Sequence, residues 1–468
     1  MDAGAGKNRS GKRGMELTKP TLAGAALTLI HTRQAGTRSE LTARLGVTRA
    51  TVGAITGELR DLGLIQVDAG SGEGQHGRPS HRLHADPDGP VALAAELHAD
   101  GFAVAVMGLG AVIHARASHA APMRAGLEQA LAPVSEAAAA LLREWERRRS
   151  RGRRSGRICV GAAIAVQSAV TEPAETAVGA LYLGWPDGAP VRDTFAAQLA
   201  AAGVSGPHGA PLPCRVVNDV NATALAEHRH GAGRDASHLL VVSAPQRGVG
   251  GALVRRGALY AGSTGLAMEA GHVSIDPHGR PCPCGNRGCL NVETDAAAFL
   301  DTVGRRPGGT AADDRTAANR GAVDRAAADR AAGDRAAGDR AAGDRAAGDS
   351  ALSDRGDSAL QAAIRLLTDN YATDPGVRAA TAAIAERLGL GLASLINVVN
   401  PDRVLLGGLH KHLLLAEGDR LIGAAAARSP WGRAAAVPIE PCALDDSALL
   451  GAAELAWQPV LDNPALLR

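Results

Sequence analysis

The apolar positions near the start of the chain recur at helical spacing. In "TRSELTARLGVTRATVGAITGELRDLGLI", Leu41 and Leu45 lie four residues apart on one face of a first helix. Thr37 stands three residues before Glu40, the spacing of a capping box, and Thr48 can cap a second helix. The apolar stripe of that second helix is Val52, Ile55, Leu59 and Leu62. This segment is therefore predicted to form helix, turn and helix.

Strand-like patterns follow. "LIQVDAG" and "HRLH" flank the flexible segment "SGEGQHGRPS", which predicts a hairpin that could serve as a wing. Residues 20–85 are thus predicted to be a winged helix-turn-helix DNA-binding domain. In this interpretation Arg49 and Thr51, at the start of the second helix, face base edges in the major groove, and Arg78 reaches phosphate or the minor groove. The alternative is an ordinary helical subdomain.

The charge of this region supports DNA binding only modestly. Residues 1–85 hold twelve Lys and Arg against seven Asp and Glu, and much of the surplus lies in the tail 1–19, which is predicted to be disordered. Gly53 and Gly57 lie inside the second helix, where each costs about 1 kcal/mol relative to alanine. The two glycines therefore lower the stability of the predicted recognition helix.

Beyond residue 90 the pattern alternates between strands and helices, which indicates an α/β protein. The segments "VALAAELHADGFAVAVMGLGAVIHARA" and "RICVGAAIAV" are strand-like, and "GLEQALAPVSEAAAALLREWERRR" has helical periodicity. "CRVVNDVNATALAEHRHGAG" predicts strand, turn and helix, and "HLLVVSAPQRGVGGALVRRGALYAG" predicts two strands around a glycine-rich turn. Helical patterns return in "SALQAAIRLLTDNY", "GVRAATAAIAERLGLGLASLINVVN" and "ALDDSALLGAAELAWQPVL".

A repeat interrupts this alternation. Residues 311–350 run in units of five such as "AAGDR", in which no apolar stripe can form on a helix. We expect a low-complexity, disordered insertion over 305–357 within a body that spans 90–460.

The composition and the N-terminal sequence indicate in which cellular compartment the protein is expected. The chain has 468 residues and a net charge of +2, and it shows no apolar run near the roughly 18 residues of a membrane span. Its first twenty residues lack the apolar core of a secretory signal. We therefore expect a cytoplasmic protein without a membrane segment. In the cytoplasm thiols stay reduced, so clustered cysteines indicate a metal site rather than disulfides.

One such cluster is present. The spacing H-x9-C-x-C-x4-C predicts a closed, structural zinc site of the Cys3His type, because zinc prefers thiolate and imidazole ligands and no position remains for water. The alternative is a set of unrelated thiols like those elsewhere in the chain. The predicted ligands, in the loop 272–289, are His272, Cys282, Cys284 and Cys289.

The surroundings of this cluster resemble a known family. "GLAMEAGHVSIDPHGRPCPCGNRGCL" is similar to the GxxxExGH and CxCGxxGC signature of the ROK family (repressor, open reading frame, kinase). "VVNDVNATALAEHRHGAG", "GVGGALVRRGALYAG" and "LINVVNPDRVLLGG" resemble further family segments in the same order. With its N-terminal domain, the chain resembles the family's transcriptional regulators over nearly its whole length. The resemblance implies an actin-like, two-lobed sugar-kinase fold.

The resemblance also implies site residues. Asp219 matches the family's catalytic base, and Asn218, Glu269 and His272 match its sugar-binding positions. Carboxylates suit a polyol because they accept two hydrogen bonds from neighbouring hydroxyls. The alternative for Asp219 is a capping role at a helix that begins near Ala222.

The phosphate-binding turns depart from the family pattern. "ELHADGF" stands where family kinases have DxGGT, so Leu97, His98 and Ala99 replace small residues, and "PQRGVGG" stands in place of GTG. "AVQSAV" replaces a loop that usually contains Pro-Gly. Phosphoryl transfer depends on positioning by such loops, so we expect neither ATP binding nor kinase activity.

Two functions of different classes follow. The first is a sugar-responsive regulator, most simply a repressor of carbohydrate genes, which binds a palindromic operator as a homodimer or homotetramer. The second is an ATP-dependent sugar kinase, in which Asp219 would be catalytic. A third hypothesis is a regulator that binds DNA without responding to an effector.

Overall fold

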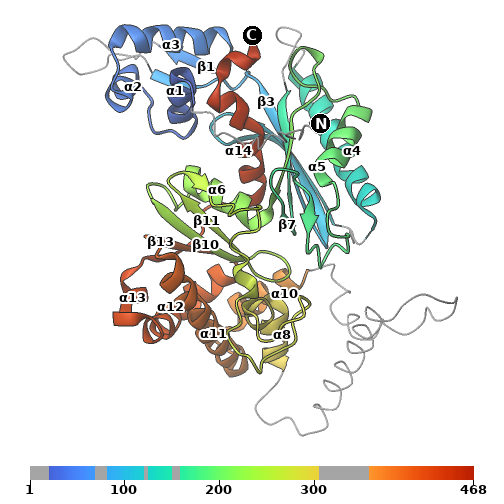
Figure 1. Cartoon of the computed structure of the whole chain (residues 1–468), viewed down its shortest axis with the longest axis vertical. Coiled ribbons are helices and arrows are strands. Elements are labelled where there is room, and N and C mark those ends of the chain that lie inside the picture. The colour runs from blue at the N-terminus through green and yellow to red at the C-terminus, as the bar shows by residue number, and fades with distance from the viewer. Residues whose placement is uncertain (1–19, 69–81, 121–124, 150–158, 305–357) are drawn as a thin grey trace, which may run out of the picture. The chain divides into compact units, whose positions relative to one another are not determined.

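The structure is a computed structural model that describes residues 20–68, 82–120, 125–149, 159–304 and 358–468 (Figure 1). The predicted tail 1–19, the wing tip with Arg78 and the insertion 305–357 lie outside the described residues. The chain divides into two compact units. Unit 1 consists of Met1–Ser237, Ala252–Met268 and Ala443–Arg468, and unit 2 consists of His238–Gly251 and Glu269–Cys442.

The first part of unit 1 has the element order of a winged helix-turn-helix. Thr37 and Glu40 form the predicted capping box: the Thr37 hydroxyl accepts the Glu40 amide at 3.2 Å, and the Glu40 carboxylate accepts the Thr37 amide at 3.1 Å. Thr48 caps the next helix through the Thr51 amide. The two following strands pair antiparallel. The elements are α1 (Leu22–His31), α2 (Arg38–Leu45), α3 (Arg49–Asp61), β1 (Ile65–Asp68) and β2 (Arg82–Ala85).

A five-stranded sheet of order β5-β4-β3-β6-β9 forms the body of unit 1. β3, β4 and β5 form an antiparallel meander, whereas β6 and β9 run parallel to β3. The strands are β3 (Val91–His98), β4 (Gly101–Gly108), β5 (Val112–Ala120), β6 (Cys159–Val166) and β9 (Cys214–Asn218). The other elements of this unit are α4 (Leu127–Arg149), β7 (Ala169–Val170), β8 (Ala177–Val178), α5 (Val191–Ala201), η1 (Pro207–Gly209), α6 (Asp219–His230), β12 (Ala258–Leu259), α14 (Ser447–Asp462) and η5 (Pro464–Leu467).

Alternation along β3 separates two apolar cores. Leu93 and Leu97 pack with the residues of α4 and α5 on one face. Ala92 and Ala94 point to the other face, which α6 and α14 cover. This second core continues without a break into Leu27 of α1 and the apolar stripe of α3. The winged helix is therefore packed against the body and does not form a separate core.

Unit 2 is built on the parallel strands β10 (His238–Ala244), β13 (Arg403–Gly408) and β14 (Ile439–Pro441), which pair in the order β10-β13-β14. β11 (Gly250–Arg255) begins in unit 2 and belongs to unit 1 from Ala252 onward. The remaining elements of unit 2 are η2 (Ala270–His272), α7 (Leu290–Thr294), α8 (Ala296–Gly304), α10 (Ala359–Asn370), α11 (Pro375–Val399), α12 (Leu409–Ala427), η4 (Pro430–Gly432) and α13 (Arg433–Ala436). Among the described residues, α11 is long and apolar enough to cross a membrane, but half of its most apolar window is buried inside the protein. This burial is that of a core helix.

Candidate functional site

Unit 2 brings the four predicted metal ligands together. The Nδ1 or Nε2 atom of His272 and the three Sγ atoms all lie within 4.8 Å of one another. His272 Nδ1 is 3.7 Å from Cys282 Sγ, and Cys284 Sγ is 3.8 Å from Cys289 Sγ. Cys282 and Cys289 are buried, whereas Cys284 is exposed at the rim. The predicted Cys/His cluster is therefore confirmed as a cluster.

The backbone around the cluster depends on glycine. Gly288 has φ +56°, and a Cβ there would lie 1.6 Å from the carbonyl oxygen of Asp276. The Cys282 amide donates to the Asn286 carbonyl at 2.8 Å, which closes a turn around Cys284. Cys289 stands at the N-cap position of α7, without a capping hydrogen bond from its side chain. The sequence reaches this irregular shape because two chain segments can approach only where a side chain is missing.

The spacing of the donor atoms fits a tetrahedral ion. Zn–S bonds of about 2.3 Å place two tetrahedral thiolates about 3.8 Å apart, which matches the separation of Cys284 and Cys289. Burial raises the pKa of the Cys289 thiol to about 12, and neighbouring thiols contribute to this shift. A cation would reverse that preference, because it stabilises the thiolates that it binds.

Asn218 and Asp219 lie at the junction of β9 and α6 in unit 1. Asn218 is the N-cap: its Oδ1 accepts the amides of Val220 at 2.9 Å and Asn221 at 3.1 Å. The alternative that Asp219 caps a helix beginning near Ala222 is therefore wrong, because α6 begins at Asp219 itself. The Asn218 side-chain amide also donates to the Ser168 carbonyl at 3.1 Å. Among the described residues, the second N–H of the Asn218 side-chain amide makes no further hydrogen bond.

A further carboxylic acid, which the sequence did not single out, belongs to this region. Glu96 lies on β3, on the face of the sheet that α6 and α14 cover. Burial, together with the charges of Asp219 and Asp446, raises the pKa of Glu96 to about 7, although Arg116 opposes the shift. Arg116 pairs with Asp446 at 2.8 Å. The only sequence signal was the position of Glu96 in the "ELHADGF" segment.

The two altered glycine turns are well defined. In the first, β3 and β4 are joined by a two-residue turn after His98, and Leu97 is fully buried in the core, so Leu97 does not line the turn. In the second, the Val249 amide donates to Asn291 Oδ1 at 2.6 Å. A Cβ on Gly271 would lie 1.9 Å from the Val249 carbonyl oxygen, so this turn packs directly on η2. Glu269, just before η2, is exposed.

The predicted DNA-contacting residues lie at the start of α3. Arg49 is exposed, and its side chain is not engaged in any ion pair among the described residues. The Thr51 hydroxyl is 2.9 Å from the Thr48 hydroxyl. A Cβ at Gly53 or Gly57 would meet nothing within 4 Å, so the face that carries Arg49 at four-residue spacing is open.

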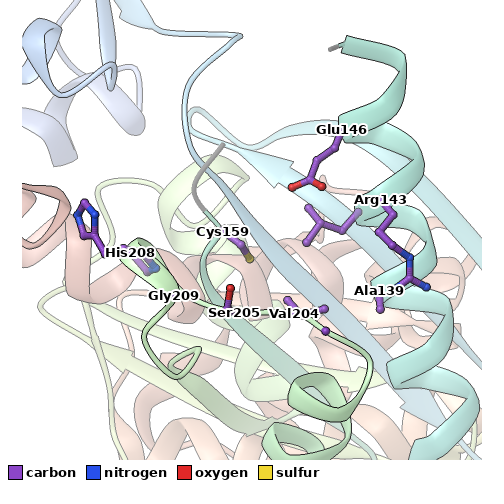
Figure 2. A pocket seen from close by; sticks show the side chains of 12 residues that line it. Ala139, Arg143, Glu146, Cys159, Val204, Ser205, His208 and Gly209 are labelled. Carbon is purple, nitrogen blue, oxygen red and sulfur yellow. The ribbon is translucent and has the colours of Figure 1, made fainter. Parts of the chain in front are cut away.

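A cavity of about 490 Å³ also opens in unit 1 (Figure 2). Arg143 and Glu146 of α4 reach it from one side, and Ser205 and His208 of the loop after α5 line the other. Burial raises the pKa of the Cys159 thiol at its wall to about 12, so this thiol is unreactive at neutral pH. None of the predicted site residues lines this cavity, which is therefore separate from them.

Comparison with known proteins agrees with this geometry. A solved ROK family transcriptional regulator, a homologue of the E. coli MLC protein, superposes with a TM-score of 0.64 and 21% identity, over 95% of this chain and 97% of that one. A ROK family glucokinase from Streptomyces griseus superposes with a TM-score of 0.57 and 21% identity, over 79% of this chain and 99% of that one. The predicted α/β class with an actin-like, sugar-kinase-type body is confirmed, and the match to the regulator extends over 95% of this chain.

Sequence comparison gives the family. The chain is 29% identical over 199 residues to a putative xylose repressor of Caldicellulosiruptor sp. (strain Rt8B.4), which covers 42% of this chain and 40% of that protein. It spans less than half of the length of the curated relatives that it matches, which include sugar kinases as well as repressors. The profile of the ROK family matches residues 149–458, well over half of the chain. The resemblance drawn from the motifs is thereby confirmed, and the chain belongs to the ROK family.

Proposed function

We propose that this protein is a sugar-responsive transcriptional regulator that represses carbohydrate genes. The observation that carries the proposal is the winged helix of α1 to β2 in one chain with a kinase-like body. A regulator structure matches 95% of the chain, whereas a kinase structure matched over 99% of its own length leaves about a fifth of this chain unmatched. A kinase has no need of such an addition.

The DNA-binding part of the proposal rests on α3. Its N-terminus presents the exposed Arg49 and the Thr48–Thr51 hydroxyl pair, which are groups that contact base edges or phosphate. Arg78, outside the described residues, would extend the contact through the wing. Because a two-fold protein reads a palindrome, the operator would be palindromic and the protein a homodimer or homotetramer in the cytoplasm.

The effector part rests on the start of α6 and on η2. Asp219 offers a carboxylate to sugar hydroxyls, and Asn218 offers its remaining N–H. Glu269 and His272 are the corresponding residues of unit 2. Relatives are named for xylose, N-acetylglucosamine, glucose and N-acetylmannosamine, so the effector class we propose is a hexose, pentose or N-acetylhexosamine.

A zinc ion would complete the loop 272–289. His272, Cys282, Cys284 and Cys289 would hold it, and with four protein ligands the ion would be structural. Zinc there would fix η2, and with it Glu269 and His272, in a loop that has little apolar core of its own.

The alternative function is an ATP-dependent sugar kinase with Asp219 as the base. The buried Asp219 at the first turn of α6 favours it. Against it stand two features of the turns that would hold phosphate. The turn after His98 has only two residues, neither of them glycine, and the Val249 turn packs on η2. We therefore propose no enzymatic activity and no ATP binding.

The test is selection of genomic fragments from the source organism by the purified, zinc-loaded protein. The selection is repeated with glucose, xylose, N-acetylglucosamine or N-acetylmannosamine present. A palindromic site that is enriched near carbohydrate genes and lost with one sugar would support the proposal.

Other outcomes separate the alternatives. Enrichment that none of these sugars alters would indicate a DNA-binding protein without effector response. No enrichment, together with ADP release in an ATP-coupled assay on the same sugars, would overturn the proposal in favour of the kinase.

A further inference from the structure

A buried polar network joins the winged helix to the body of unit 1. Its centre is Glu454 on α14, with a side chain only 2% exposed. His31, the last residue of α1, places Nε2 at 2.8 and 3.0 Å from the two carboxylate oxygens. From the end of α6, Arg229 donates to Glu454 Oε2 at 2.6 Å, and His230 Nε2 lies 2.8 Å from Oε1.

The protonation of His31 follows from its second nitrogen. The Gly110 amide donates to His31 Nδ1 at 2.9 Å, so the ring proton is on Nε2 and points at Glu454. Burial alone would raise the pKa of Glu454, but His31, Arg229 and His230 together hold that pKa well below its usual range. Glu454 therefore stays ionised, and every group that faces it donates a hydrogen bond.

Two imidazoles and a carboxylate could also hold a metal ion, and their donor atoms lie within 4.8 Å of one another. The hydrogen bonds of these side chains argue against a metal site here. The Nε2 atom of His31 carries a proton, and the Arg229 cation already occupies Glu454 Oε2. The network is complete without an ion.

α6 connects this network to the proposed effector residues. It begins at Asp219 behind the cap Asn218 and ends at His230, so both ends of one twelve-residue helix are functional candidates. α6 is also locked to α14 along its length. A Cβ on Gly451 would lie 1.8 Å from the Ala222 carbonyl oxygen, and the Thr223 and Ser447 hydroxyls are 3.1 Å apart.

α1 is fixed to α14 at its other end as well. The Thr21 amide donates to the Asp462 carbonyl at 2.9 Å. A Cβ on Gly24 would lie 2.4 Å from the same oxygen, so the two helices touch backbone to backbone. α1 therefore cannot tilt on the body without breaking contacts at Asp462, at Glu454 or at both.

We propose that α6 and α14 pass effector occupancy from Asn218 and Asp219 to the winged helix, with Glu454 and His31 as the positioning residues at the junction. This inference rests on the proposed function. A buried network of charge-assisted hydrogen bonds loses stability when one partner is withdrawn. A shift of α6 that moves Arg229 or His230 away from Glu454 must therefore either move α1 along with it or free α1 from the network. Sugar binding at the start of α6 would thus change the orientation of α3 toward DNA.

The first test needs no sugar. Hydrogen exchange is measured on the full-length, zinc-loaded protein and on Glu454→Gln, with His31→Gln as a milder second variant that keeps the Arg229–Glu454 pair. Val460→Ala, a buried apolar truncation on α14, is the control for general loss of stability. We expect at least about tenfold faster exchange both in α1 and at the Val220 and Asn221 amides, beyond the effect of the control. Faster exchange in α1 alone would overturn the proposal.

The second test uses operator release. Operator affinity is titrated with and without whichever of glucose, xylose, N-acetylglucosamine or N-acetylmannosamine releases the wild-type protein. In Glu454→Gln the ratio of the two affinities should fall at least about fivefold, while calorimetric binding of that sugar changes less than about twofold. An unchanged ratio would overturn the inference.

A wild-type protein that no sugar releases would count against the proposed function instead. Hydrogen exchange alone would then decide whether α6 and α1 are coupled.

Discussion

Replacing Glu96 by glutamine should stabilise unit 1, and the gain should grow with pH. Glu96 is half-buried on β3, and burial together with the charges of Asp219 and Asp446 raises the pKa of its carboxyl from 4.5 to about 7. The folded protein therefore holds this proton more tightly than the unfolded chain. Well below pH 4.5, Glu96 is protonated in both the folded and the unfolded state and does not change the free energy of unfolding. As the pH rises, its ionisation lowers that free energy, and the loss is complete above pH 7.

The magnitude follows from the two pKa values. At roughly 1.4 kcal/mol per pH unit, the loss of unfolding free energy is about 1 kcal/mol at pH 5.5 and about 3 kcal/mol at pH 8.5. The difference in unfolding free energy between Glu96→Gln and wild type should thus increase by about 2 kcal/mol from pH 5.5 to pH 8.5.

The assay is urea unfolding followed by tryptophan fluorescence. Trp145, Trp185 and Trp457 are buried in unit 1, so they report on the unit that contains Glu96. Glu136→Gln, at an exposed position on α4, is the matched control and should show no pH-dependent difference from wild type. A difference between Glu96→Gln and wild type that stays constant from pH 5.5 to 8.5 would refute the reasoning, since it would mean that Glu96 titrates normally.

Two further predictions concern the metal loop and DNA. Wild-type protein should contain about one zinc per chain, and Cys284→Ser should lose most of it and its effector response before it loses its fold, because one of four ligands is removed; an unchanged zinc content by elemental analysis would contradict this. Arg49→Ala should weaken operator binding by about 1 to 3 kcal/mol in a fluorescence-anisotropy titration, and equal affinity would remove Arg49 from the set of DNA contacts.

Most elements of the fold could be predicted from local patterns in the sequence. The capping box at Thr37 and Glu40 and the apolar stripe of α3 were readable because helix signals act within a few residues. The ligand spacing predicted the cluster for a similar reason, since its four residues lie within eighteen positions of sequence.

What the sequence did not reveal depends on distant contacts. His31 and Glu454 are 423 residues apart, and nothing near either residue predicts their pairing. The raised pKa of Glu96 likewise arises from Asp219 and Asp446, which only the fold brings near it. The alternative of a capping role for Asp219 is wrong because Asn218 is the cap of α6. Asn and Asp are equally good caps, so only the point at which β9 ends could decide between them.

The same substitution at two glycines should have opposite effects, which tests the close crossing of α6 and α14. Alanine at Gly53, in the middle of α3, meets nothing within 4 Å and should stabilise the protein by about 1 kcal/mol through helix propensity. Alanine at Gly451, in the middle of α14, gains the same propensity, but its Cβ would lie 1.8 Å from the Ala222 carbonyl oxygen.

Because that neighbour is backbone, the two helices would have to separate. We expect a net loss of about 1 to 3 kcal/mol in the same urea assay. A midpoint that rises for Gly451→Ala as it does for Gly53→Ala would mean that α14 can slide on α6 at no cost. In that case a shift of α6 could not move α14, and the route from Asp219 to the winged helix would have to run through another element.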